Sequence, residues 1–188
     1  MSAPIRINLG CGSFPIAGAY GLDRIQLSHT DVIADLSAPA LPFKSGSVSD
    51  IYAYHVLEHL AFVPLMDEIH RVLADGGVFH VRVPHFSSYG FWDDPTHIRP
   101  FTSRTFDYWE PSYYVDYALP RRFKVLRKEL HFFANPEATR FKFLPWLTNG
   151  ILLRGIEFLA NRNIRFCERF WAHYIGGFTE IEFELKKV

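Results

Sequence analysis

A short apolar strand that runs directly into a glycine turn is the feature that most constrains this chain. Residues 5–12 read Ile-Arg-Ile-Asn-Leu-Gly-Cys-Gly, and the alternating apolar side chains predict a buried strand that ends at Gly10. Gly10 and Gly12 allow positive φ and leave the main chain open to a ligand that a Cβ would block. This pattern is typical of a nucleotide site at the carboxyl end of a strand in an open α/β sheet, although a plain tight turn has the same pattern.

Four more strands and one helix follow in quick succession. We expect the strands over residues 20–23, 30–36, 48–55 and 78–84, and the helix over residues 64–74. The gap between the first two strands is too short for a helix, and Pro15 and Gly18 disfavour one there. Strands joined by short loops and a helix predict a largely parallel sheet.

The strands expected over residues 20–23 and 30–36 both finish at an acidic residue, Asp23 and Asp35. A carboxylate at the end of the second strand can accept hydrogen bonds from both hydroxyl groups of a ribose. The alternative for Asp23 is a solvated residue in the turn that continues into Arg24. Together with the glycine turn, the acidic strand ends favour a nucleoside-binding edge of the sheet.

Two strands and a basic helical segment make up the C-terminal third. We expect strands over residues 123–133 and 178–188; the second alternates apolar and acidic residues, which is typical of a half-exposed antiparallel strand. Between them, we expect residues 135–176 to form a crossover with a basic amphipathic helix over residues 146–174. This helix packs on the sheet with its arginines in solvent, forms a homodimer, or contacts an anionic membrane surface.

Composition sets the outer limits. A chain of 188 residues is long enough for a single domain over residues 1–188 with a substantial core. Its formal net charge is zero, so no overall field favours nucleic acid as a partner. Two cysteines cannot build a disulfide framework, and the N-terminus shows no signal-peptide pattern, so we expect a cytoplasmic protein.

Several linked motifs resemble the class I S-adenosylmethionine-dependent methyltransferases, and in particular their small type 11 branch. The motifs are Asn8-Leu9-Gly10-Cys11-Gly12, Asp23, Asp35-Leu36 through Leu41-Pro42-Phe43, Ser47-Val48-Ser49-Asp50-Ile51, His55-Val56-Leu57-Glu58-His59-Leu60 and Arg71-Val72-Leu73-Ala74-Asp75-Gly76-Gly77. They cover about residues 5–84 in consistent order. The chain departs from the family at Phe14, where a third glycine is common, and in the expected lack of a helix between the first two strands.

This resemblance implies the fold, the cofactor and the cofactor site. The fold is α/β, a Rossmann-like and mostly parallel seven-stranded sheet with an antiparallel last strand and helices on both faces. The cofactor is S-adenosylmethionine, with methyl transfer as the reaction. The residues that the resemblance assigns to cofactor binding are Asn8, Gly10, Cys11, Gly12, Asp23, Asp35, Leu36 and His55.

Residues 85–120 are polar and aromatic and follow the fifth strand, which predicts an acceptor-site lid or insert. Methyl transfer to a hydroxyl that is not acidic needs a base. His97, His85, His59 and Asp94 are the candidates. We prefer His97, because Asp94 could orient it, and we take His97, Asp94 and His59 as the catalytic set. For each histidine, a loop residue held by the backbone is the alternative.

The segment His55-Val56-Leu57-Glu58-His59 also spells a zinc-protease signature, in which two histidines four residues apart on a helix bind the metal. Because His55 is expected to end a strand, this helical geometry should fail, and we expect no metal. Glu58 and His59 can equally stabilise the turn into the following helix.

We therefore expect an S-adenosylmethionine-dependent methyltransferase that acts on a small-molecule acceptor. O-methylation of a sugar or another hydroxylated metabolite fits best, by analogy with one-domain enzymes and because aromatic faces pack against sugar rings. One rival is a catalytically inactive S-adenosylmethionine-binding protein that acts through a partner protein. A Rossmann dehydrogenase is a second rival, and the short approach to the second strand argues against it.

Overall fold

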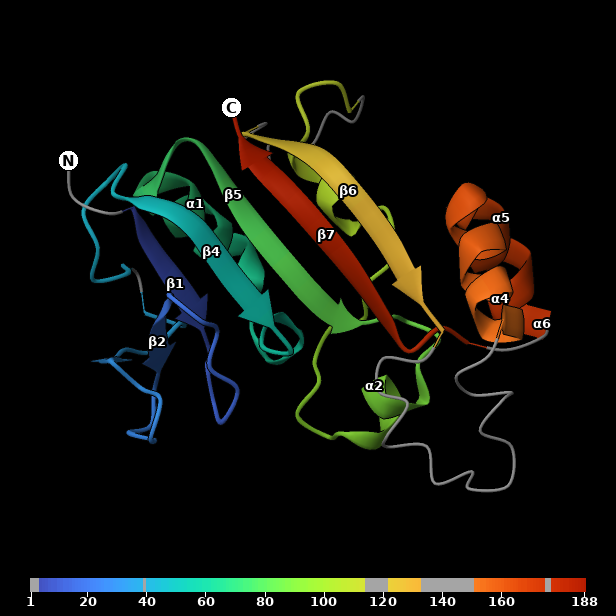
Figure 1. Ribbon diagram of the computed structural model, residues 1–188, viewed down its shortest axis with the longest axis horizontal. Coiled ribbons are helices and arrows are strands. Elements are labelled where there is room, and N and C mark those ends of the chain that lie inside the picture. Colours follow the sequence, from blue (N-terminus) through green and yellow to red (C-terminus); the bar gives the residue numbers. More distant parts are fainter. Residues whose placement is uncertain (1–3, 39, 114–121, 133–150, 175–176) are drawn as a thin grey trace.

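The computed structural model describes residues 4–38, 40–113, 122–132, 151–174 and 177–188. Its centre is a seven-stranded sheet with the order β3-β2-β1-β4-β5-β7-β6 (Figure 1). The strands are β1 (Ile5–Leu9), β2 (Tyr20–Asp23), β3 (Val32–Ile33), β4 (Val48–Tyr54), β5 (Leu73–Pro84), β6 (Phe123–His131) and β7 (Glu180–Lys187). Strands β1 to β5 run parallel, and β7 is antiparallel to both of its neighbours. The predicted mixed sheet with a reversed last strand is confirmed.

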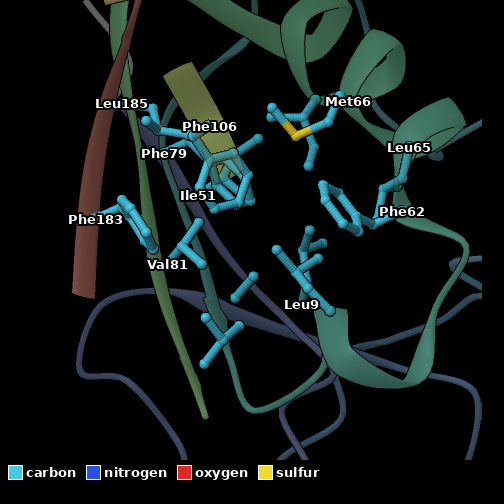
Figure 2. Close-up of a cluster of buried hydrophobic side chains, with 14 of the residues drawn as sticks. Leu9, Ile51, Phe62, Leu65, Met66, Phe79, Val81, Phe106, Phe183 and Leu185 are labelled. Atoms are coloured by element: carbon cyan, nitrogen blue, oxygen red, sulfur yellow. The ribbon is translucent and has the colours of Figure 1, made fainter. Parts of the chain in front are cut away.

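Apolar side chains on one face of the central strands form the core. They pack against helix α1 (Phe62–Val72) and against the short helix η2 (Thr105–Trp109). Phe62 of α1 lies 5.8 Å from Phe106 of η2, and Phe106 lies 4.9 Å from Phe183 of β7, measured between ring centres. Each such fully buried side chain contributes about 1.5–3 kcal/mol. Figure 2 shows the cluster, whose labelled members are Leu9, Ile51, Phe62, Leu65, Met66, Phe79, Val81, Phe106, Phe183 and Leu185.

The other face of the central strands carries aromatic and polar side chains, because successive residues of a strand point to opposite faces. Tyr52 of β4 stacks on His80 of β5 with ring centres 4.6 Å apart, and the Arg82 guanidinium lies over the ring of Tyr54. In the described part of residues 10–47, the only regular elements are β2 and β3. The predicted lack of a helix between the first two strands is therefore confirmed.

Two strands differ from the prediction by more than two residues at an end, and the other strands and the helix expected over residues 64–74 by two or fewer. The third strand covers only Val32–Ile33, because Asp31 turns its carboxylate back to accept a hydrogen bond from the Gly21 N–H at 2.7 Å. The fifth strand begins at Leu73, directly after α1, so Gly76 lies inside β5 instead of closing the helix. Gly76 has a φ of +76°, and the pairing of β4 with β5 shifts register in this region.

The C-terminal helical segment is divided into four parts, not the single helix predicted over residues 146–174. These parts are α4 (Ile151–Arg162), α5 (Ile164–Phe166), the π-helix η3 (Cys167–Trp171) and α6 (Ala172–Tyr174). The break lies at Asn163, which has extended φ and caps the next turn by accepting from the Phe166 N–H at 3.1 Å. Residues 135–150 and 175–176 of the predicted crossover and residues 114–120 of the predicted lid lie outside the described residues.

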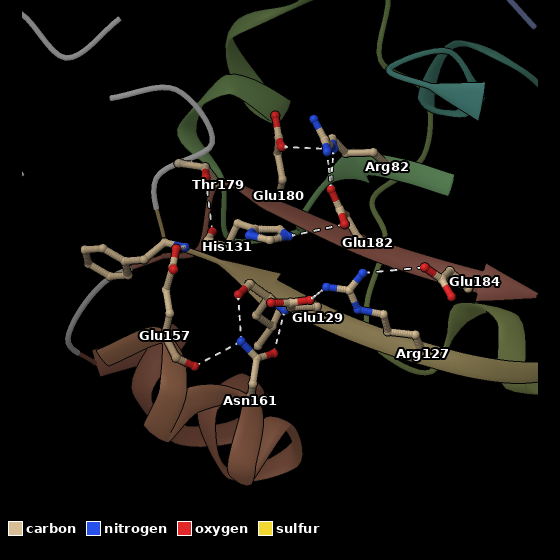
Figure 3. A network of polar contacts seen from close by, with 12 residues as sticks. Arg82, Arg127, Glu129, His131, Glu157, Asn161, Thr179, Glu180, Glu182 and Glu184 are labelled. Carbon is tan, nitrogen blue, oxygen red and sulfur yellow. Dashed lines mark hydrogen bonds and ion pairs between the residues drawn. The ribbon is translucent and has the colours of Figure 1, made fainter. Parts of the chain in front are cut away.

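Helix α4 lies beside the C-terminal end of β6, at the outer edge of the sheet (Figures 1 and 3). The Asn161 amide accepts from the Leu130 N–H at 2.7 Å and donates to the Leu130 carbonyl at 3.0 Å, and Glu157 accepts from the Phe132 N–H. Side chains of α4 thus take the place of a neighbouring strand at the C-terminal end of β6 and protect that part of its free edge. Within the described residues, no helix has the length and apolar character needed to cross a membrane.

Candidate active site

The glycine turn lies where the carboxyl ends of β1 and β2 meet. Gly10 and Gly12 have φ values of +61° and +48°. The Gly12 N–H donates to Oδ2 of Asp23 at 3.0 Å, which ties the turn to the end of β2. A Cβ at Gly12 would meet no atom within 4 Å, so the main chain here faces open space that a ligand can approach.

Gly10 is constrained in a different way. A Cβ at this position would lie 2.5 Å from Cγ2 of Val56, so Gly10 is needed for the close packing of the turn against the segment after β4. This contact places residues 55–59 beside the glycine turn. The part of the main chain that is open to a ligand is therefore at Gly12.

Asp23 is positioned as predicted, at the end of β2. Its Oδ2 accepts from Gly12 and its Oδ1 accepts from the Ile25 N–H at 3.1 Å. Each carboxylate oxygen can accept more than one hydrogen bond, so both keep capacity for a ribose hydroxyl. The backbone contacts fix the direction in which the carboxylate points.

The other residues assigned to cofactor binding lie in varied surroundings. The Asn8 amide donates to the Phe14 carbonyl and closes the glycine turn from inside. The Cys11 thiol points away from the open side, 3.4 Å from the His29 carbonyl, and burial raises its pKa. Asp35 is exposed and accepts from the Ser37 N–H, whereas Leu36 packs into the core.

His55 directly follows β4 and has a φ of +55°, an unusual conformation for a residue other than glycine. Its Nε2 lies 2.8 Å from Oε1 of Glu180, and its Nδ1 lies 3.5 Å from Oε1 of Glu58. Burial alone would lower the pKa of His55, but these two carboxylates raise it to about 9. The ring is therefore positively charged at neutral pH, and a role for His55 toward a cofactor falls to its main chain.

The structure brings the three predicted catalytic residues together. His59 and His97 lie with ring centres 4.6 Å apart. Thr96 joins His59 to Asp94, because its Oγ1 lies 2.8 Å from Nδ1 of His59 and donates to Oδ1 of Asp94 at 2.7 Å. Asp94 Oδ2 is 3.8 Å from Nε2 of His97. Asp94 therefore lies near the His97 ring, beyond hydrogen-bond distance, and does not orient it.

The carbonyl oxygen of Phe91 orients His97 instead, at 2.9 Å from Nδ1. A carbonyl can only accept, so Nδ1 carries the proton and Nε2 of the neutral ring has the free lone pair. The His97 side chain is 8% exposed, and the Ile98 N–H donates to the Glu58 carbonyl at 2.8 Å. The loop after β5 is thus fastened onto the segment after β4.

Sequence reasoning underestimated Glu58. This residue of η1 (Leu57–His59) is fully buried and close to His55 and His97. The signal was present, because Glu58 is the carboxylate between the two histidines of the His55–His59 motif, but a stabilising role in a turn explained it equally well.

His85 is excluded as the base. It is completely buried, with Nδ1 2.7 Å from Oγ of Ser87 and Nε2 3.1 Å from Oε1 of Glu168. Glu168 of η3 also accepts from the backbone N–H and the hydroxyl of Ser103. Both ring nitrogens are therefore occupied, and the group fastens the C-terminal helical segment to the end of β5.

A hollow of about 410 Å³ lies beside the histidine cluster. Its lining includes Leu60 and Ile98, the neighbours of His59 and His97 in sequence, together with Phe62 and Arg99. The Arg99 guanidinium lies over the Phe62 ring at 5.1 Å from its centre. The hollow is mainly apolar with one cationic group at its wall, which suits a small molecule.

Residues 18–81 match the family model described as a methyltransferase domain. No curated protein matches the chain in sequence. Among solved structures, an S-adenosylmethionine-dependent methyltransferase from Archaeoglobus fulgidus has a TM-score of 0.57 and 17% identity, covering 97% of this chain and 86% of that one. The methyltransferase in a complex with the Haloferax volcanii activator Trm112 has a TM-score of 0.56 and 17% identity, with coverages of 97% and 81%.

A third structure is geranyl diphosphate C-methyltransferase from Streptomyces coelicolor, in complex with Mg²⁺, geranyl diphosphate and S-adenosylhomocysteine. It has a TM-score of 0.54 and 14% identity, and covers 99% of this chain and 72% of that one. At this identity, the structural likeness speaks for the fold. Residues 18–81 therefore match a methyltransferase domain, and the chain as a whole has the Rossmann-like fold of S-adenosylmethionine-dependent methyltransferases.

Proposed function

We propose that the protein methylates a small hydroxylated acceptor, such as a sugar or another polyhydroxy metabolite. S-adenosylmethionine supplies a methyl group activated by its sulfonium sulfur. The observation that carries the proposal is the contact between Gly10 and Val56, which sets the cluster of His59, Asp94 and His97 beside the glycine turn. A nucleoside at the turn would leave its reactive end toward that cluster.

The residues at the turn fit the cofactor. Gly12 presents main chain that no side chain covers, and Asp23 offers two carboxylate oxygens at the end of β2. These are the groups needed to receive a nucleoside and its ribose hydroxyls. Gly12 and Asp23 support cofactor binding more strongly than Asp35, which is exposed and accepts a hydrogen bond from the Ser37 N–H in its own turn.

The histidine cluster supplies the acceptor side of the reaction. The acceptor oxygen forms a bond to the methyl carbon while the bond from that carbon to sulfur breaks. The acceptor proton leaves toward Nε2 of His97, the ring nitrogen whose lone pair is free. Positioning of the reacting atoms accounts for much of the rate, and the loop fastened by Ile98 and Glu58 holds that geometry.

The test is methyl transfer by the His97→Ala variant. Tritiated S-adenosylmethionine is incubated with a panel of sugars, polyols and phenols, and the labelled product is counted. Loss of the base should lower turnover about 10²–10⁴-fold, while affinity for S-adenosylhomocysteine stays within about threefold. The matched control is His131→Ala, a histidine of β6 whose partner is Glu182 and which lies outside the cluster of His59, Asp94 and His97.

Two outcomes contradict this assignment. If His97→Ala keeps more than a tenth of the wild-type rate, the residue is structural. If the wild-type protein binds S-adenosylhomocysteine and yet methylates no acceptor, alone or with cell extract, the protein acts through a partner. A methyltransferase of the same fold is found in complex with an activator protein, so the second outcome calls for a search for such a partner.

A further inference from the structure

Glu58 is a buried carboxylate that shares its nearest cation, the His55 ring, with Glu180. Its side chain is 1% exposed, and neither oxygen accepts a hydrogen bond from any described residue. Its Oε1 lies 3.5 Å from Nδ1 of His55 and 4.0 Å from Nε2 of His97, at or beyond the range of a hydrogen bond. Burial of a carboxylate without hydrogen bonds costs several kcal/mol, so a group that binds both oxygens would relieve this cost.

His59 and His97 each have one ring nitrogen with a free lone pair that can bind a metal ion. His97 directs Nδ1 to the Phe91 carbonyl, which leaves Nε2 free. The Thr96 hydroxyl gives its proton to Asp94, so its oxygen is left to accept from Nδ1 of His59, which likewise leaves Nε2 of His59 free. Histidines that bind metal characteristically hold their second ring nitrogen in this way, to a carbonyl or a carboxylate-bound group.

We propose that Glu58, His59 and His97 bind one divalent transition-metal ion. One ligand atom from each residue lies within 4.8 Å of those of the other two. A tetrahedral ion with bonds of about 2.0–2.2 Å separates its ligand atoms by about 3.3 Å, so the side chains need to close by up to about 1.5 Å. Glu58 and His59 are adjacent in η1 and His97 is fastened to the same turn, so rotations of the side chains suffice.

Two imidazoles and one carboxylate favour Zn²⁺, Mn²⁺, Fe²⁺ or Co²⁺ over Mg²⁺ and Ca²⁺, which prefer oxygen ligands alone. Three protein ligands leave at least one position for water or for an oxygen of the acceptor. Asp94, whose Oδ2 is 3.8 Å from Nε2 of His97, lies close enough to bind that water.

This set of ligands differs from the zinc-protease pattern. In that pattern, His55 and His59 would share the ion, but the structure directs Nε2 of His55 to Glu180. The expected failure of the helical geometry is correct, since residues 57–59 form a single 3₁₀ turn. The ion we propose uses the carboxylate of the motif and a histidine from the loop after β5, which sequence spacing could not indicate.

A second group, Glu129, His131 and Glu182, also brings three ligand atoms together. It differs from the first because arginines donate hydrogen bonds to its carboxylates, Arg127 to Glu129 and Arg82 to Glu182 (Figure 3), whereas no described residue donates one to Glu58. Neither carboxylate of this second group lacks a hydrogen-bond donor that an ion would replace. This group therefore serves as an internal control.

A bound ion would take over the activation of the acceptor. An ion held by Glu58, His59 and His97 would lower the pKa of an acceptor hydroxyl, and Nε2 of His97 would then be a ligand while Asp94 or water would take the proton. This consequence rests on the proposed function, whereas the binding of the ion does not. The two claims can therefore fail separately.

The test is metal binding by the full chain without cofactor or acceptor. Protein stripped with EDTA and freed of the chelator is titrated with Co²⁺, followed by visible absorption, and with Zn²⁺, followed by calorimetry. We expect one ion per chain, with affinity reduced about a hundredfold or more in Glu58→Gln and His97→Ala and about 10–100-fold in Thr96→Ala. His131→Ala should bind as wild type does, and circular dichroism checks that each variant is folded.

Absence of binding at millimolar Co²⁺ and Zn²⁺ would overturn the proposal. Binding that Glu58→Gln and His97→Ala leave unchanged, or that His131→Ala removes, would overturn it as well. A parallel titration with S-adenosylhomocysteine keeps the two claims apart, because a protein that binds the cofactor but no metal refutes only the metal site.

Discussion

Replacing Gly10 by alanine should destabilise the fold much more than the same change at Gly12, although both glycines have positive φ. An alanine at either position pays about 1–2 kcal/mol for the left-handed conformation. At Gly10 the new Cβ also lies 2.5 Å from Cγ2 and 2.9 Å from Cβ of Val56, and such overpacking costs about 1–3 kcal/mol more. At Gly12 the Cβ enters open space.

We therefore expect a loss of about 2–5 kcal/mol in the free energy of unfolding for Gly10→Ala and of about 1–2 kcal/mol for Gly12→Ala. Urea denaturation measures both values. The Val56→Ala change should partly restore Gly10→Ala, because it removes the two γ-methyl groups and leaves only the Cβ contact at 2.9 Å. A double-mutant cycle isolates this coupling.

For cofactor affinity measured on folded protein, we expect the larger loss in Gly12→Ala and the smaller one in Gly10→Ala. The Cβ at Gly12 occupies the space that a nucleoside needs, and a clash of about 1–3 kcal/mol corresponds to a loss of about tenfold to a hundredfold. Calorimetry with S-adenosylhomocysteine gives the affinity. If both variants lose equal stability, or if Gly12→Ala binds as wild type does, the assignment of Gly12 as the open part of the turn is wrong.

Three further outcomes follow from contacts in the structure. Asp23→Ala should weaken S-adenosylhomocysteine binding about tenfold to a hundredfold in calorimetry, because charge-assisted hydrogen bonds of about 1.5–3 kcal/mol are lost; unchanged affinity would place the ribose elsewhere. Glu168→Ala should cost about 3–5 kcal/mol in urea unfolding, because it leaves both Ser103 donors buried without an acceptor, and a loss below 1 kcal/mol would contradict this role. The ion pair with His131 is the main cause that lowers the pKa of Glu182 to about 2. The Glu182 carboxylate therefore stabilises the fold fully above pH 4.5, by at most about 3 kcal/mol. This stabilisation is lost as the pH falls toward 2. Unfolding measured from pH 6 to about pH 2.5 should therefore show a flatter acid limb for Glu182→Gln, and equal slopes would refute the linkage.

Local chemistry explains which parts of the fold could be predicted. The alternating run that ends at Gly10 predicted β1 and its turn, because hydrophobic period and glycine conformation are both local properties. Pro15 and Gly18 predicted the missing helix for the same reason. The alternation around Ile181 and Phe183 predicted the half-buried β7.

Contacts between distant segments explain what could not be predicted. The apolar period continues on both sides of Asn163, so the sequence does not reveal the break there. The role of the Asn161 amide depends on β6 lying beside it, because the amide hydrogen-bonds the backbone of that strand. The same holds for the site. The spacing of Asp94 and His97 suggested that the carboxylate orients the ring, but the Phe91 carbonyl does so, and a backbone partner leaves no mark in the sequence.

The account as a whole depends on the glycine turn between β1 and β2 being a nucleoside site. The direct test is calorimetry of the wild-type protein with S-adenosylhomocysteine and with NAD, supported by thermal unfolding in the presence of each ligand. We expect S-adenosylhomocysteine to bind one per chain and, at a concentration of about 100 times Kd, to raise the free energy of unfolding by about 2.7 kcal/mol, while NAD has no effect. No heat and no shift with millimolar S-adenosylhomocysteine, or stabilisation by NAD instead, would contradict the central claim.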